Sequence, residues 1–347
     1  MNNTNFGRVE IIAIITAVVL TVATFGGYLV KTRAQAQEAP KTEQAAQPAA
    51  GGNAEGPAEQ GTPEQEAAEK EAAEKAAAEK EAKEAAEKAA AEKEAEEQAK
   101  REAEEAEQQR ADAEAALQQR REEAQQAVAQ MSLEDKVSRL FLVTPEALTG
   151  ADLATVAGDM TRRALDQYPV GGIVYAAQNI ENREQITALL SGTEEFSRYP
   201  VFLAAGQDIP ADGEFADAGF NMQMLGNEER PASAEEAEAL GEQYAEENRA
   251  VCAAVPAEEV NADLTANMNS DEALHQVLVA GDLINQENNG AYAMGQAAVA
   301  AIDGGADLLL VRQEFQAVRQ AVLNAVWNGQ LTEEKIDEAL IRVYTAY

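Results

Sequence analysis

Residues 172–205 read GIVYAAQNIENREQITALLSGTEEFSRYPVFLAA, and this stretch decides the fold. It begins with a short apolar run at 172–175 and ends with another at 201–205. Between them, residues 182–196 carry apolar side chains at helical spacing, which predicts an amphipathic helix. The order of strand, helix and strand predicts two parallel strands that are covered by the helix between them.

The same alternation returns near the C-terminus. Apolar runs at 277–279 and 307–311 predict strands, and residues 291–303 and 315–328 predict the helices that follow them. Upstream, Ser132 and the acidic residues after it form a capping-box-like start to a helix whose apolar side chains include Val137, Leu140 and Phe141. We therefore expect an α/β fold with a parallel sheet over residues 131–347.

The N-terminal part has a different composition. After a tail at 1–10, residues 11–30 are uncharged and apolar over about 20 residues, enough to cross a bilayer as one helix. The run is longer than the apolar core of a cleaved secretory signal, which is the alternative, so we predict an uncleaved signal-anchor. Basic residues on both sides of the run leave its orientation undecided. Residues 31–62 are rich in Ala, Gln, Gly, Pro and Glu, which predicts a disordered linker.

Residues 63–130 predict a long helical spacer. They consist almost entirely of Ala, Glu, Lys, Gln and Arg, the strongest helix formers, with Glu and Lys at spacings that favour ion pairs along the helix. A two-stranded coiled coil remains the alternative, but between 67 and 116 the apolar positions hold Ala alone instead of Leu, Ile or Val. A single charge-stabilised helix is favoured.

Charge and residue counts exclude several classes of function. The formal net charge of −35 repels phosphate, so we expect no nucleic-acid partner. The single cysteine, Cys252, and the single histidine, His275, can supply neither a disulfide within the chain nor a zinc site, and no glycine-rich phosphate loop is present. We therefore expect no metal and no cofactor.

Several phrases in the globular part carry a family resemblance. They are MSLEDKV at 131–137, FLVTPEAL at 141–148, YPVGGIVY at 168–175 and AAVAAIDGGADLLL at 297–310. In this order they resemble the N-terminal (β/α)8 domain of glycoside hydrolase family 3, and most closely its bacterial β-N-acetylhexosaminidases. The ending LTEEKIDEALIRV at 331–343 is similar to the closing helix of that family.

The resemblance implies a sugar-binding carboxylate and a nucleophile, and both positions are altered. Where the family has a sugar-binding Asp after its F-L-A strand, this chain has Gly206, with Asp208 as a shifted substitute. A gapless comparison places Gly281 at the nucleophile, whereas a slip of one residue places Asp282 there. No stretch matches the histidine-containing loop that furnishes the family's acid/base. Asp282 and Asp208 are the weak candidates for catalysis and substrate binding.

The resemblance also implies a barrel that typically needs about 250 residues, and residues 131–347 fall short of that length. We expect an incomplete or rearranged (β/α)8 barrel, with any open edge covered by a rearranged sheet, a helix or a dimer contact. The favoured function is a membrane-anchored, non-catalytic protein outside the cell that binds wall glycan or scaffolds another envelope protein. The alternatives are a weak or altered β-N-acetylhexosaminidase and an assembly element in which the helix matters most.

Overall fold

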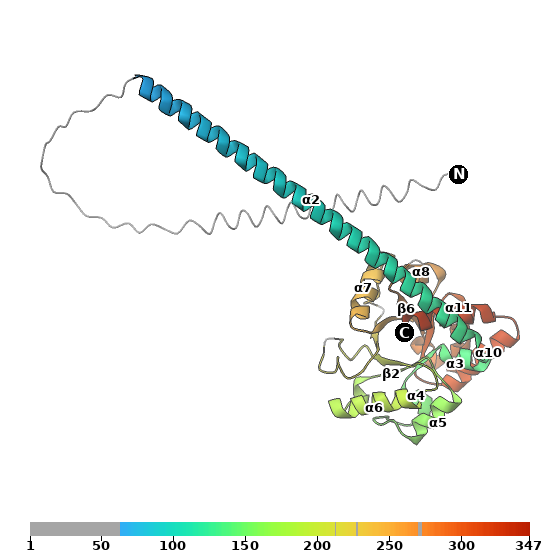
Figure 1. Cartoon of the computed structure of the whole chain (residues 1–347). Coiled ribbons are helices and arrows are strands. Elements are labelled where there is room, and N and C mark those ends of the chain that lie inside the picture. The colour runs from blue at the N-terminus through green and yellow to red at the C-terminus, as the bar shows by residue number, and fades with distance from the viewer. Residues whose placement is uncertain (1–62, 212, 227, 270–272) are drawn as a thin grey trace, which may run out of the picture. The chain divides into compact units, whose positions relative to one another are not determined.

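The computed structural model describes residues 63–347 except 212, 227 and 270–272. Seven strands form a closed, all-parallel barrel in which each strand pairs with the next and β1 pairs with β7 (Figure 1). The strands are β1 Phe141–Val143, β2 Gly172–Tyr175, β3 Phe202–Ala205, β4 Met222–Leu225, β5 Ala250–Pro256, β6 Val277–Asp282 and β7 Leu308–Val311.

Helices surround the strands in the βα order that the sequence predicts. They are α3 Leu133–Arg139, α4 Pro145–Thr149, α5 Asp159–Gln167, α6 Arg183–Phe196, α7 Ala234–Glu246, α8 Ala262–Met268, α9 Gly290–Asp303, α10 Phe315–Trp327 and α11 Glu333–Ala346. Short 3₁₀ turns follow three of the strands: η1 Ala177–Asn179, η2 Ala257–Glu259 and η3 Ile284–Asn289. The described residues between β3 and β4 form turns and bends in place of a covering helix.

The barrel is one strand short of eight, as an incomplete or rearranged barrel predicts. Its described strands leave no open edge, because Phe141, Leu142 and Val143 of β1 register with Leu309, Leu310 and Val311 of β7. Closure satisfies the backbone groups that an edge would expose. Phe141 was expected in a helix, yet α3 ends at Arg139 and Phe141 begins β1. Ser132 does cap α3, with its Oγ accepting the Asp135 N–H at 3.1 Å.

Buried side chains form two layers of core. In the outer layer, outward-pointing side chains of the strands pack against helix residues such as Ile186, Val299 and Leu340. Residues that point inward fill the barrel itself: Leu142, Val174, Phe202, Ala204, Met222, Met224, Cys252, Ala254, Leu278, Ala280, Leu308 and Leu310. The interior is therefore a packed core with no open channel, as in other barrels of this type.

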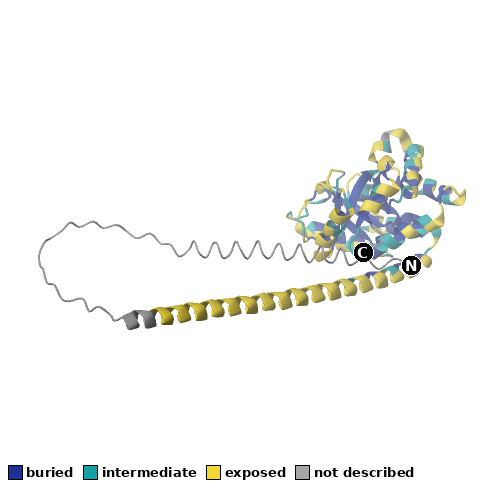
Figure 2. Ribbon diagram, turned by 90° about the horizontal axis from the view of Figure 1, so that it is seen from above, coloured by how far each residue is buried: buried dark blue, intermediate teal, exposed yellow. Residues whose placement is uncertain are grey.

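Helix α2, Pro63–Ala129, is 67 residues long and covers the range predicted for the helical spacer. Its side chains are exposed from Lys70 to Asp112, as the yellow ribbon in Figure 2 shows. Exposed i,i+4 ion pairs such as Lys75–Glu71 and Lys100–Glu104 lie along the helix. Such pairs contribute only a few tenths of a kcal/mol each. Residues 87–347 form one compact unit, which includes residues 87–129 of α2.

The last turns of α2 pack against the barrel. Leu117, Ala124 and Val128 are buried, at a spacing that places them on one helix face. Arg120 Nη1 donates to the Thr345 carbonyl oxygen of α11 at 3.3 Å. Within the described residues, no helix has both the length and the apolar composition that a membrane crossing needs. The predicted signal-anchor at 11–30 and the linker at 31–62 lie outside the described residues.

Candidate functional site

The C-terminal ends of the strands are where barrel enzymes of this type place their active sites. Side chains along a strand alternate between the two faces, so the inward positions can be followed from the interior core to the rim. Seven residues continue that inward alternation at the C-terminal rim: Thr144, Ala176, Gly206, Gly226, Pro256, Asp282 and Arg312. This set, which we call the mouth ring, holds one carboxylate and one guanidinium.

These two charges bind each other. Arg312 Nη1 donates to Asp282 Oδ1 at 2.7 Å, and Arg312 Nη2 donates to Asp282 Oδ2 at 3.3 Å. Asp282 Oδ1 also accepts the backbone N–H of Ile284 at 3.0 Å. The residue is buried, with 8% of its surface exposed. Both oxygens of the mouth-ring carboxylate are therefore already hydrogen-bonded within the protein.

The structure distinguishes the two alignments of the nucleophile strand. A side chain at Gly281 would point outward, since its Cβ would lie 2.8 Å from the Ala301 Cβ of α9. Asp282 has the inward parity of Leu278 and Ala280, which lie in the interior core. The gapless alignment therefore puts Gly281 against the helix layer, and the one-residue slip puts Asp282 at the mouth.

The sugar-binding position cannot carry a side chain in this backbone. A Cβ on Gly206 would lie 2.7 Å from the Tyr175 carbonyl oxygen, which belongs to the neighbouring strand and cannot give way cheaply. Asp208 does not fill the position, because its Oδ2 accepts the backbone N–H of Ala177 at 2.8 Å and so ties the β3 loop to η1. Asp208 is an exposed residue with a structural partner.

Other carboxylates near the rim also have partners. Glu146 Oε1 accepts from Asn179 Nδ2 at 2.7 Å and from the Ala154 N–H at 3.0 Å, which fixes the loop after α4. Glu229 Oε2 accepts the Gly226 N–H at 2.9 Å, and Glu258 Oε1 accepts from Asn285 Nδ2 at 3.1 Å. These side chains hold loops, and sequence reasoning did not single them out because isolated loop carboxylates have no distinctive spacing.

The remaining reactive residues lie away from the mouth. Cys252 is in the barrel interior, where burial raises the pKa of its thiol and keeps it protonated. His275 lies near the N-terminal end of β6, where its backbone packs against Gly241 of α7. No group of three His, Cys, Asp or Glu side chains suited to a metal ion occurs among the described residues.

The arrangement is poorly suited to glycoside hydrolysis. A retaining enzyme needs a carboxylate nucleophile and a proton donor facing it across the bond, about 5–5.5 Å apart when both are carboxyls. The mouth ring supplies one carboxylate, and its partner is a guanidinium, which cannot donate a proton at neutral pH. What the geometry does provide is a charge pair that joins β6 to the end of β7.

The barrel resembles proteins of known structure, although the sequence alone finds no match. The sequence matches no protein-family model and no curated protein. A glycoside hydrolase family 3 β-N-acetylglucosaminidase from Paenibacillus sp. is 17% identical, with a TM-score of 0.46, over 61% of this chain and 61% of that chain. Solved structures of family 3 glycoside hydrolases are among those that the barrel resembles.

Two further solved structures show the extent of the match. A Mycobacterium smegmatis glycosyl hydrolase is 15% identical over 63% of this chain and 98% of that chain, with a TM-score of 0.45. A Beutenbergia cavernae β-N-acetylhexosaminidase is 16% identical over 62% and 98%, with a TM-score of 0.42. The match spans less than two thirds of the Paenibacillus enzyme.

Replacing Asp282 with alanine is expected to lower the free energy of unfolding by about 1–3 kcal/mol, because the partly buried Arg312 loses the charged hydrogen-bond partner that the buried carboxylate provides. Asp208→Ala, which removes one exposed hydrogen bond to a backbone N–H, is the matched control and should cost less than about 1 kcal/mol. Urea unfolding followed by circular dichroism measures both. Equal costs for the two variants would show that the Asp282–Arg312 pair does not stabilise the barrel.

Proposed function

We propose that this protein is a non-catalytic relative of the family 3 glycoside hydrolases, whose barrel serves as a glycan-binding or scaffolding domain at the end of a helical spacer. The observation that carries the proposal is the state of the mouth ring. Its carboxylate, Asp282, is neutralised by Arg312 and hydrogen-bonded at both oxygens. Gly206, at the family's sugar-binding position, has no room for a side chain.

The spacer supports a positional role. A helix of 67 residues extends about 100 Å at 1.5 Å per residue. Combined with the signal-anchor predicted at 11–30, this length would hold the barrel well away from the bilayer, on the outer face of the cell membrane. The function then depends on where the barrel is held and what it binds, and wall glycan or an envelope protein is the partner we propose.

A second candidate is an altered glycosidase, and one observation favours it. Asp282 has inward parity at the C-terminal rim, where a barrel nucleophile belongs. In that candidate, substrate would have to displace Arg312 from the carboxylate, and the proton donor would have to come from a loop. The two candidates differ in whether any turnover depends on Asp282.

The test combines turnover and binding on the full-length chain. Release of nitrophenol from p-nitrophenyl N-acetyl-β-D-glucosaminide is measured beside co-sedimentation with insoluble wall glycan. The proposal expects no release above the protein-free rate, together with retention on the glycan or on an envelope protein. Turnover that Asp282→Ala abolishes would establish the second candidate. An absence of both turnover and binding to wall glycan would leave the scaffolding role alone.

A further inference from the structure

A cavity of about 590 Å³ lies at the end of the barrel opposite the mouth. It opens where the C-terminal turns of α2 cross the residues that lead into β3 and the end of α11. We call it the floor cavity. Its volume falls in the range of about 300–1,000 Å³ that is usual for small-molecule sites. Nothing in the mouth ring contributes to it, so it is separate from the site described above.

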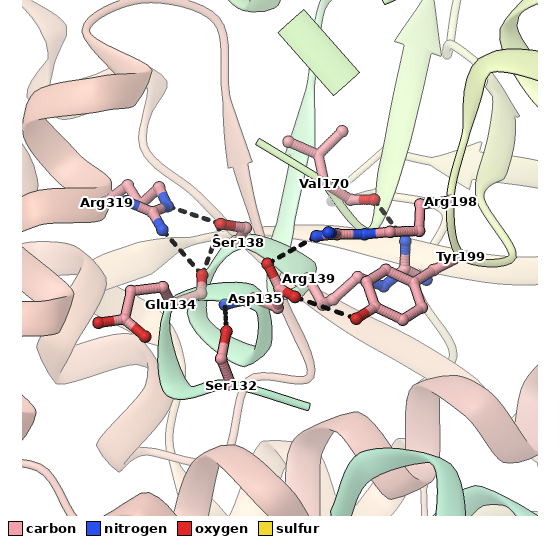
Figure 3. Close-up of polar contacts among 9 residues, drawn as sticks. All are labelled: Ser132, Glu134, Asp135, Ser138, Arg139, Val170, Arg198, Tyr199 and Arg319. Carbon is pink, nitrogen blue, oxygen red and sulfur yellow. Dashed lines mark hydrogen bonds and ion pairs between the residues drawn. The ribbon is translucent and has the colours of Figure 1, made fainter. Parts of the chain in front are cut away.

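Three tyrosines line the floor cavity: Tyr199, Tyr344 and Tyr347. The Tyr347 ring packs at 5.3 Å from the ring of Phe202, which belongs to the barrel interior core. Tyr199 lies in the loop between α6 and β3. Its hydroxyl donates to Asp135 Oδ2 at 3.0 Å, which holds the ring in place (Figure 3). Aromatic rings held in this way offer rigid apolar faces at little cost in side-chain entropy.

Arg139 makes cation–π contacts with two of these rings. Its guanidinium lies 5.8 Å from the centre of the Tyr199 ring and 5.2 Å from that of Tyr344. It is almost fully buried and is held by the carbonyl oxygens of Val170, at 2.5 Å, and Pro200 (Figure 3 shows the former). The two rings already interact with a cation, so a second cation would gain little and would be repelled by the first.

Anionic ligands are disfavoured as well. The chain carries a formal net charge of −35, and Glu123 lies at the edge of the cavity beside Arg120. With cations and anions both disfavoured, the cavity suits a neutral ligand. Such a ligand would need flat apolar faces to contact the tyrosine rings and polar groups to bond with the side chains at the rim. Arg120 and Gln130 supply donors, Glu123 supplies acceptors, and the tyrosine hydroxyls stay protonated, since burial raises the pKa of both Tyr344 and Tyr347.

From this geometry we propose that the floor cavity is a binding site for a neutral saccharide. The C–H faces of a sugar ring stack on tyrosine rings because they are apolar and flat, and its hydroxyls both donate and accept hydrogen bonds. The inference rests on the proposed glycan-binding function and deepens it by placing the glycan at the end of the barrel opposite the mouth. Because Arg120 and Glu123 belong to α2, the spacer forms part of the site.

The experiment titrates the full-length chain with N,N′,N″-triacetylchitotriose by isothermal calorimetry. Tyr347→Ala removes a ring that is 48% exposed, so it tests the site with little risk to the fold. We expect binding to weaken at least tenfold in this variant and in Arg120→Ala. Tyr292→Ala is the matched control, since Tyr292 is a tyrosine on α9 that is 81% exposed and lies outside the cavity. It should bind as the unmodified protein does.

Circular dichroism melts of each variant separate loss of a contact from loss of the fold. Binding that survives Tyr347→Ala and Arg120→Ala but fails in Arg312→Ala would place the glycan at the mouth and overturn the floor cavity. No binding of the trisaccharide by the unmodified protein would also overturn it. Turnover of p-nitrophenyl N-acetyl-β-D-glucosaminide would refute the non-catalytic function and not the cavity, so the two failures are distinguishable.

Discussion

Replacing Asp307 with alanine is expected to lower the free energy of unfolding by about 3–5 kcal/mol, the usual cost of removing one partner from a buried ion pair. Asp307 is fully buried at the start of β7. Its Oδ1 accepts from Arg342 Nε at 2.6 Å, and its Oδ2 accepts from Asn269 Nδ2 at 2.6 Å and from the Val279 N–H at 2.8 Å. One carboxylate, directly before β7, therefore bonds to β6, to α11 and to the C-cap residue of α8.

The control for Asp307 is Asp303, four residues earlier. Asp303 pairs with Lys335, but the two side chains are 63% and 40% exposed, so solvent screens the pair. Asp303→Ala should cost less than about 1 kcal/mol. Urea unfolding of the two variants under the same conditions gives the comparison. Similar costs would mean that the buried network around Asp307 does not stabilise the barrel.

The second large effect is expected at Gly171. An added Cβ would lie 2.1 Å from the carbonyl oxygen of Arg139, a backbone atom at the end of α3 that cannot rotate away. The Gly171 backbone cannot move either, because its N–H donates to the Phe141 carbonyl oxygen and its own carbonyl accepts from the Phe202 N–H, both at 2.9 Å. Gly171→Ala should therefore destabilise the protein by about 3 kcal/mol or more.

Gly226→Ala provides the matched control for Gly171. At Gly226 the nearest atoms to an added Cβ are carboxamide and carboxylate ends of Gln207 and Glu229, at 3.4 and 3.5 Å, and flexible side chains can shift. We expect a change within about 1 kcal/mol, typical of a substitution without a steric conflict. The midpoints of thermal unfolding report both variants, and a normal midpoint for Gly171→Ala would contradict the packing described for β1, β2 and β3.

Much of the fold could be predicted from the sequence. The βα alternation around 172–205 and 277–328 has strong apolar periodicity, and the observed elements match it to within a few residues. Strand β4, Met222–Leu225, was missed because its Met-Gln-Met-Leu sequence has neither β-branched residues nor a helix after β3 to frame it. The pairing that closes the barrel could not be predicted, because β1 and β7 come from the two ends of the domain and their pairing has no local signal.

The site was less accessible to sequence reasoning. A shift of one residue moves every side chain of a strand to the opposite face, so Gly281 and Asp282 could not be distinguished without the register. Arg312 was not singled out, although its position two residues after the inward-facing Leu310 was an available signal. Among the tyrosines of the floor cavity, Tyr199 is far in sequence from Tyr344 and Tyr347, and only folding brings it beside them.

The measurement that tests the central claim most directly is the rate at which the full-length protein releases nitrophenol from p-nitrophenyl N-acetyl-β-D-glucosaminide. With the Asp282 carboxylate held by Arg312, the account predicts a rate equal to that of buffer without protein, and the same rate for Asp282→Ala. Turnover by the unmodified protein that disappears in Asp282→Ala would contradict it and would make Asp282 a working nucleophile.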